Sequence, residues 1–196
     1  MRSRVVAALL FVAVVAGAAG CSSDDDPDAD PSSEATDTTS SVTTDATAEV
    51  SDVEPASGEL VQLDTSVSLR LPKEYDWYTD DGGGSIFATA TVDGVTVDVA
   101  ASDVLWELEP LDDAAQTSLQ TLEDVPGMTY RRVDNTTVAG IECWVIEGEN
   151  AKKRYREIGT LRNGRLVHVG FTFHAADQPD FAEDMIASVL ASVEWK

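Results

Sequence analysis

Positive charge is scarce in this chain. Its 196 residues include 13 Lys and Arg against 36 Asp and Glu, which gives a formal net charge of −23 and a pI of about 4.1. A nucleic-acid-binding surface needs basic side chains that displace counterions from phosphates, and anionic lipid surfaces attract basic segments. The composition therefore argues against nucleic acid as a partner and against a membrane contact made by surface charge.

Cysteine and histidine are also scarce, with two residues of each. Two cysteines cannot make a disulfide framework, and His168 and His174 lack the spacing of a metal site. The run Gly82-Gly83-Gly84 precedes a predicted strand instead of a helix, so it does not match a phosphate loop. No Gly-x-Ser-x-Gly motif is present. We therefore predict no metal ion, no cofactor and no catalytic residue.

The N-terminal hydrophobic run, from Val5 to Gly20, is short. As a helix it would span about 24 Å at ~1.5 Å per residue, which is less than the roughly 30 Å hydrocarbon core of a bilayer. Because Arg2 and Arg4 precede this run, residues 1–20 are predicted to be a secretory signal peptide and not a transmembrane helix.

The segment Ala18-Ala19-Gly20-Cys21 resembles the lipobox of bacterial lipoproteins. The resemblance implies that the Cys21 thiol receives a diacylglyceryl group and that the chain is cut just before it. Acyl chains contribute about 0.8 kcal/mol per buried CH₂, so two or three chains would hold the protein on the extracytoplasmic face of the cell membrane. The alternative is an ordinary signal peptide in which Cys21 is incidental.

Residues 22–57 are predicted to be a disordered tether. They contain 14 Ser or Thr and 11 Asp or Glu, and they contain no Lys or Arg. Such a segment cannot bury enough apolar surface to offset its ordering entropy, and its like charges extend it. A solvated spacer and a Thr-rich glycosylated stalk remain as two interpretations of this tether.

Residues 58–196 show the patterns of one α+β domain. Alternating apolar and polar residues predict strands, Asp93-Gly94 and Asn163-Gly164 predict tight hairpin turns, and apolar residues at helical spacing predict two helices. We expect an antiparallel sheet with helices packed on it. The predicted strands cover residues 67–71, 86–92, 95–99, 129–133, 141–147, 154–162 and 166–173, and the predicted helices cover residues 112–122 and 178–190.

Several short motifs, each at a turn or a strand end, are spread along this domain. They are Leu71-Pro72, Asp76-Trp77, Val138-Ala139-Gly140, Trp144 to Glu147, Gly159-Thr160-Leu161, Asn163-Gly164 and Ile186-Ala187-Ser188-Val189. Together they resemble actinobacterial LpqN-type lipoproteins over about residues 60–195. The resemblance implies a PsbP-like fold, an antiparallel sheet between helices, and an envelope lipoprotein with an interaction or lipid-handling role. It transfers no active site, because the motifs are structural.

Basic residues are concentrated in one part of the domain. Eight of its 11 Lys and Arg residues fall between positions 131 and 165, on predicted neighbouring strands, where they would form a local patch on an acidic domain. We expect these residues to pair with nearby carboxylates and to keep the sheet soluble; the functional alternative is an anion-binding face for a lipid head group or a partner protein of the envelope. The eight residues are Arg131, Arg132, Lys152, Lys153, Arg154, Arg156, Arg162 and Arg165, and the first six of them are the candidate binding residues.

Cys143 is expected to be a small buried residue. It lies between Ile141 and Val145 on the same face of a predicted strand. A nucleophilic cysteine needs a base and an electropositive setting, and the neighbouring sequence supplies neither.

These observations lead to the hypothesis of a lipid-anchored, non-catalytic domain that binds partners at the cell envelope through its surfaces or a shallow groove between sheet and helix. The rival hypothesis is a carrier of lipids or other hydrophobic ligands, with an apolar cavity. A weaker alternative is an enzyme whose site is assembled from distant residues. Cavity volume separates the first two, and clustered residues with strongly shifted pKa values would favour the enzyme.

Overall fold

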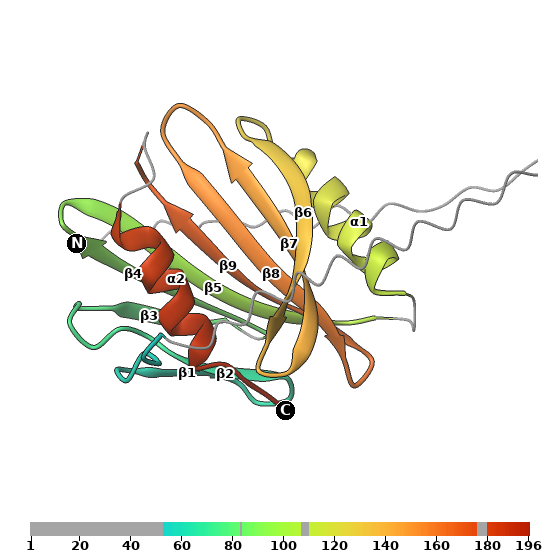
Figure 1. Cartoon of the computed structure of the whole chain (residues 1–196), viewed down its shortest axis with the longest axis horizontal. Helices are drawn as coiled ribbons and strands as arrows, with labels where there is room; N and C mark the ends of the chain where they lie inside the picture. The colour runs from blue at the N-terminus through green and yellow to red at the C-terminus, as the bar shows by residue number, and fades with distance from the viewer. Residues whose placement is uncertain (1–52, 83, 107–109, 176–179) are drawn as a thin grey trace, which may run out of the picture. The chain divides into compact units, whose positions relative to one another are not determined.

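The computed structural model describes residues 53–82, 84–106, 110–175 and 180–196, which form ten strands and two helices (Figure 1). The predicted signal peptide, Cys21 and the tether as far as residue 52 lie outside these residues. The strands are β1 Leu60–Leu63, β2 Val67–Arg70, β3 Tyr78–Asp81, β4 Ser85–Val92, β5 Val95–Leu105, β6 Thr129–Val138, β7 Ile141–Glu149, β8 Arg154–Arg162, β9 Arg165–Phe173 and β10 Glu194–Trp195, and the helices are α1 Leu111–Glu123 and α2 Phe181–Ala191. Within the described part of the chain, no helix is long and apolar enough to cross a bilayer.

The fold is α+β, as predicted, with antiparallel pairing of neighbouring strands. A seven-stranded sheet has the order β3-β4-β5-β9-β8-β7-β6, and a three-stranded sheet has the order β1-β2-β10. Asp93 and Asn163 have φ values of 50°, and the glycine after each also has a positive φ. Two consecutive positive φ values make type I′ turns, whose twist matches that of the strands they join. The predicted turns therefore set the pairing of β4 with β5 and of β8 with β9.

Each face of the seven-stranded sheet has its own hydrophobic core. The main core packs α2 and the three-stranded sheet on residues such as Val145 and Phe171, and a second core packs α1 on Trp144 and Ile146. Neighbouring residues of one strand serve different cores because side chains alternate between the two faces of a sheet. Figure 1 shows α2 crossing one face and α1 lying beside β6 and β7.

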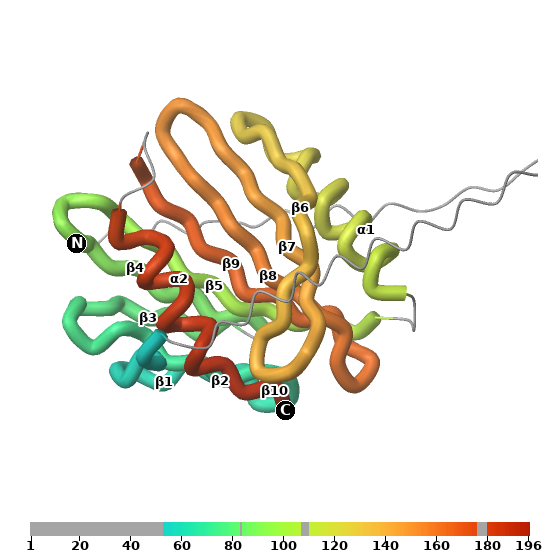
Figure 2. Tube along the Cα trace, in the orientation of Figure 1, coloured from blue at the N-terminus to red at the C-terminus, as the bar shows by residue number. Residues whose placement is uncertain are grey.

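Three short strands were not anticipated from the sequence. β1, β3 and β10 are four, four and two residues long, too short for an alternating pattern to be recognised. Figure 2 shows how the chain returns at its C-terminus so that β10 lies beside β2. Packing also begins before the predicted domain boundary at residue 58, because Ala56 is buried and its N–H donates to the Ser188 carbonyl over 2.9 Å.

Cys143 lies in the main core, as expected, and is fully buried. Burial raises the pKa of its thiol to about 12, so the reactive thiolate is nearly absent at neutral pH. We expect iodoacetamide at pH 8 to leave Cys143 unmodified in a folded Cys21→Ser chain, where Cys143 is the single thiol. The same reagent should modify it promptly in urea. Rapid labelling of the folded chain would show that the thiol is accessible and activated.

Candidate functional site

Three arginines of the predicted basic patch come together beneath α2. Arg131 on β6 and both Arg154 and Arg156 on β8 line one cavity with Ile186 of α2. They share a face because the strand register places Arg131 opposite Glu147 and Glu147 opposite Arg156, and Arg154 lies two residues before Arg156 on the same strand.

The patch is not continuous, and this part of the prediction was wrong for Arg132. It follows Arg131 on β6, so its side chain lies on the opposite face of the sheet, where it pairs with Asp112 of α1 over 2.6 Å. Lys152 and Lys153 lie in the turn between β7 and β8, and their backbone N–H groups donate to the side chain of Asn150.

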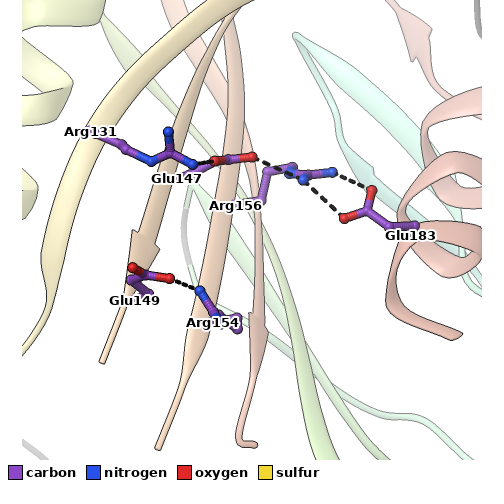
Figure 3. Close-up of polar contacts among 6 residues, drawn as sticks. All are labelled: Arg131, Glu147, Glu149, Arg154, Arg156 and Glu183. Atoms are coloured by element: carbon purple, nitrogen blue, oxygen red, sulfur yellow. Dashed lines mark hydrogen bonds and ion pairs between the residues drawn. The ribbon is translucent and has the colours of Figure 1, made fainter. Parts of the chain in front are cut away.

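A chain of ion pairs ties the sheet to α2 (Figure 3). Arg131 pairs with Glu147 over 2.5 Å, Glu147 pairs with Arg156 over 3.0 Å, and Arg156 pairs with Glu183 of α2 over 2.7 Å. The guanidinium of Arg156 makes a second bond to Glu183 over 3.0 Å, so this contact is bidentate. The chain joins β6, β7, β8 and α2 in that order, as Figure 3 shows.

The positive charge of Arg156 is stabilised by its two glutamate partners. Burial by itself would lower the pKa of its guanidinium, but the hydrogen bonds and charges of Glu183 and Glu147 outweigh burial and raise it. Arg156 is 24% exposed and Glu183 is 56% exposed in their side chains. Since solvent screens such a pair, it contributes at most about 1 kcal/mol to stability and can be broken without unfolding the domain.

Two cavities adjoin along this ion-pair chain. The first has a volume of about 280 Å³, and charged side chains line it, including those of Arg154 and its partner Glu149. The second has a volume of about 290 Å³ and is mainly apolar. Both are lined by Glu147, Arg156 and Ile186, so they are the polar and apolar halves of one groove. We call this feature the α2 groove.

The histidines form two separate polar pairs. His168 Nε2 lies 2.6 Å from the hydroxyl of Ser102, and His174 Nε2 lies 2.6 Å from a carboxylate oxygen of Asp98. Among the residues that the structure describes, no three His, Cys, Asp or Glu side chains come close enough together to hold a metal ion.

Glu157 is a buried carboxylate that sequence reasoning missed. It is 2% exposed and accepts hydrogen bonds from Ser118 of α1 over 2.5 Å and from Tyr155 over 2.7 Å. The pKa of the Tyr155 hydroxyl lies well above its usual value because of burial and the nearby Glu157 carboxylate. Alternation along β8 places Glu157 and Tyr155 on one face, but no local signal shows that α1 covers them. The cluster anchors α1 to the sheet.

Comparisons with known proteins add little to these observations. No protein-family model and no curated protein sequence matches the chain. A protein of Bacteroides thetaiotaomicron, solved at 1.50 Å resolution, aligns with a TM-score of 0.44 and 14% identity over 66% of this chain and 45% of its own. The T6SS immunity protein TplEi of Pseudomonas aeruginosa, in complex with an "L" peptide, aligns with a TM-score of 0.34 and 12% identity over 65% of this chain and 58% of its own. The chain thus spans less than two thirds of either structure, and neither likeness assigns a family or a function.

Proposed function

We propose that this chain is a lipid-anchored extracytoplasmic lipoprotein whose folded domain binds a ligand or partner in the α2 groove without catalysis. The observation that carries the proposal is the union of a charged half, in which the arginines are ion-paired with glutamates, and an apolar half in one groove. Small-molecule sites in proteins combine an apolar lining with a few placed polar groups in this way. The anchor itself rests on the lipobox resemblance at Cys21.

The LpqN-type resemblance is compatible with this proposal. The α+β architecture, with antiparallel sheets and two helices, agrees with the coarse arrangement expected of a PsbP-like domain. We propose membership of that family on the motifs alone, among them the turn at Ala139-Gly140, where both residues have positive φ.

A carrier of lipids or hydrophobic ligands is the second candidate. The apolar half of the groove favours it, with side chains of Val133, Val145 and Leu190 around about 290 Å³. This volume lies just below the range of roughly 300–1,000 Å³ that is usual for ligand pockets. It suits one slender apolar group.

Mass spectrometry of protein purified gently from the source membrane tests the proposal. Under denaturing conditions we expect a mature chain that begins at an acylated Cys21. Under native conditions we expect a bound mass that is lost from an Ala187→Trp variant, because Ala187 lines the apolar half of the groove and an indole would fill it.

Ala191→Trp is the matched control, since Ala191 lies on the same helix, is half-buried and does not line the groove. A lipid as the bound mass would favour the carrier, and a protein would favour the interaction domain. A free thiol at Cys21 would refute the anchor, and equal loss of the bound mass in both variants would refute the groove.

A further inference from the structure

We infer that the α2 groove binds an extended peptide segment of a partner protein, and that this segment adds as a further strand to the outer edge of β6. Its main chain pairs with β6, and two of its side chains enter the groove. The inference rests on the proposed function, since it requires that the groove is the binding site, and it names the class of partner.

The strand β6 offers a free edge. It is the last strand of the seven-stranded sheet, and in the ranges that the structure describes its backbone pairs with β7 alone. The pairing with β7 is regular from Thr129 to Val133, and a bulge interrupts it between Val133 and Thr136. Because an edge strand presents unpaired N–H and C=O groups on its outer side, an extended peptide can pair with the regular stretch.

The opposite edge of the sheet is protected against pairing. The strand β3 is four residues long, and Asp80 and Asp81 at its end are exposed. Short edge strands and charged side chains are common means of blocking added strands. By contrast, residues 129–133 of β6 include no acidic residue, and the two arginines among them are held on the two faces of the sheet by pairs with Glu147 and Asp112. Of the two edges, β6 is therefore the one suited to a partner.

The α2 groove follows this free edge. Thr129 and Arg131 of β6 line its polar half, and Val133 and Thr136 line its apolar half. Every second side chain of a strand lies on the same face, at a spacing of about 6.8 Å. A strand added beside β6 has the same spacing. One of its side chains would therefore lie beside Arg131 in the polar half, and the next on that face would lie beside Val133 in the apolar half.

The polar half of the groove suits an uncharged polar side chain. Its arginines, Arg131, Arg154 and Arg156, are each ion-paired with a glutamate, so this half is polar without a net charge. A charged ligand would have to compete with one of these pairs. A side-chain amide or hydroxyl can instead form hydrogen bonds beside them and leave the pairs intact.

The apolar half suits one apolar side chain. Val145 and Ile158 of the sheet and Ile186 and Leu190 of α2 line it, and their side chains offer no hydrogen-bonding groups. Its volume of about 290 Å³ is just below the range of roughly 300–1,000 Å³ usual for small-molecule pockets. In strand addition the pocket needs to hold only a side chain, because main-chain hydrogen bonds supply affinity and the pocket supplies specificity.

An NMR titration with an uncharged heptapeptide, acetyl-TQTLTQT-amide, tests this inference. The protein is the labelled chain from residue 21 onward with Cys21→Ser, which carries no acyl chain. Because the peptide reads the same in both directions, its central leucine reaches the apolar half in either strand orientation. We expect shifts in β6 and α2, slower exchange of alternate amides in residues 129–133, and no shifts in β3. Replacing the leucine by serine should weaken binding about tenfold or more, because the burial of a leucine side chain is lost.

Two N-methylated peptides distinguish strand pairing from other contacts. One is methylated at the amides of both glutamines and the leucine, and the other at the amides of the two inner threonines next to the leucine. Since alternate amides of a strand point to opposite edges, one peptide should lose binding and the other should keep it. In the protein, Ala187→Trp should remove the preference for leucine over serine by filling the apolar half, and Ala191→Trp should keep it.

Three results would overturn the inference. Equal weakening by both methylated peptides would show that no strand forms, and shifts confined to β3 would place the peptide on the other edge. The third is an absence of shifts at millimolar peptide. A lipid mass lost from Ala187→Trp in the native measurement would then still support the groove, with a lipid as its occupant. Equal loss of the bound mass in Ala187→Trp and Ala191→Trp would instead refute the groove itself, so the two failures are distinguishable.

Discussion

Gly159→Ala is expected to destabilise the domain by about 3 kcal/mol, at the upper end of the usual cost of overpacking a core. A Cβ atom at Gly159 would lie 2.1 Å from Cζ2 and 2.4 Å from Cε2 of Trp144, which is far inside van der Waals contact. Trp144 is fully buried under α1 and cannot swing out to make room. Urea unfolding should show the loss directly, and the melting temperature should fall by about 10 °C.

Gly82→Ala is the matched control, because a Cβ atom there meets nothing within 4 Å, and it should leave stability nearly unchanged. Trp144→Leu alone should be destabilising, since it leaves a cavity. Combined with Gly159→Ala it should cost less than the sum of the two single changes, because the smaller side chain relieves the clash. Additive losses would mean that the ring and the glycine do not meet.

Asp103→Asn is expected to cost about 2 kcal/mol at pH 7, the size of losing hydrogen bonds to a charged group. Asp103 on β5 is buried and accepts hydrogen bonds from Ser66 over 2.5 Å, from Thr65 over 3.1 Å and from Arg165 over 2.5 Å. These bonds tie the turn between β1 and β2 to β5 and β9. An amide carries no charge and cannot accept all three.

The cost of Asp103→Asn should depend on pH. Burial by itself would raise the pKa of the Asp103 carboxyl, but the bonds from Arg165, Ser66 and Thr65 outweigh burial and lower it. A lowered folded-state pKa stabilises the domain above the unfolded value of about 3.9, and this stability is lost as the pH falls through the folded value. Urea titrations should therefore show the difference between Asp103→Asn and the unmodified protein narrowing below about pH 4.

Asp80→Asn provides the control for this charge change, because Asp80 is exposed on β3. It should alter stability by a few tenths of a kcal/mol at most. An equal effect of both substitutions, or a difference that stays constant as the pH falls, would show that the buried network does not stabilise the domain.

The glycines of the seven-stranded sheet illustrate what local patterns miss. Gly148 lies directly opposite Tyr130, and Gly159 lies directly opposite Trp144, in the strand register. A glycine inside a strand normally weakens it, but here a ring from the next strand occupies the space that a side chain would fill. The alternation of apolar and polar residues predicts these strands correctly, but it does not indicate why they tolerate glycine.

The candidate site was predicted in part. Clustering of basic residues pointed to Arg131, Arg154 and Arg156, which the structure brings together. It did not separate Arg132, which lies on the other face. It also did not indicate Glu183, because an acidic residue in the first turn of a helix is already favourable for the helix dipole and so carries no sign of a distant partner.

The sequence by itself determined the elements whose causes are local. Alternation predicted the long strands, Asp93-Gly94 and Asn163-Gly164 predicted hairpins whose residues have the required positive φ values, and apolar spacing predicted both helices. The α+β class followed from the order of these elements.

Only the tertiary structure decided which face of the sheet each helix covers and that a second sheet of three strands forms. It also decided that ion-paired and apolar side chains meet in one groove under α2. The physical reason is that burial and pairing depend on neighbours far away in the chain. β10 pairs with β2, and Arg156 meets Glu183, only after the sheet has assembled, so no window of the sequence contains both partners.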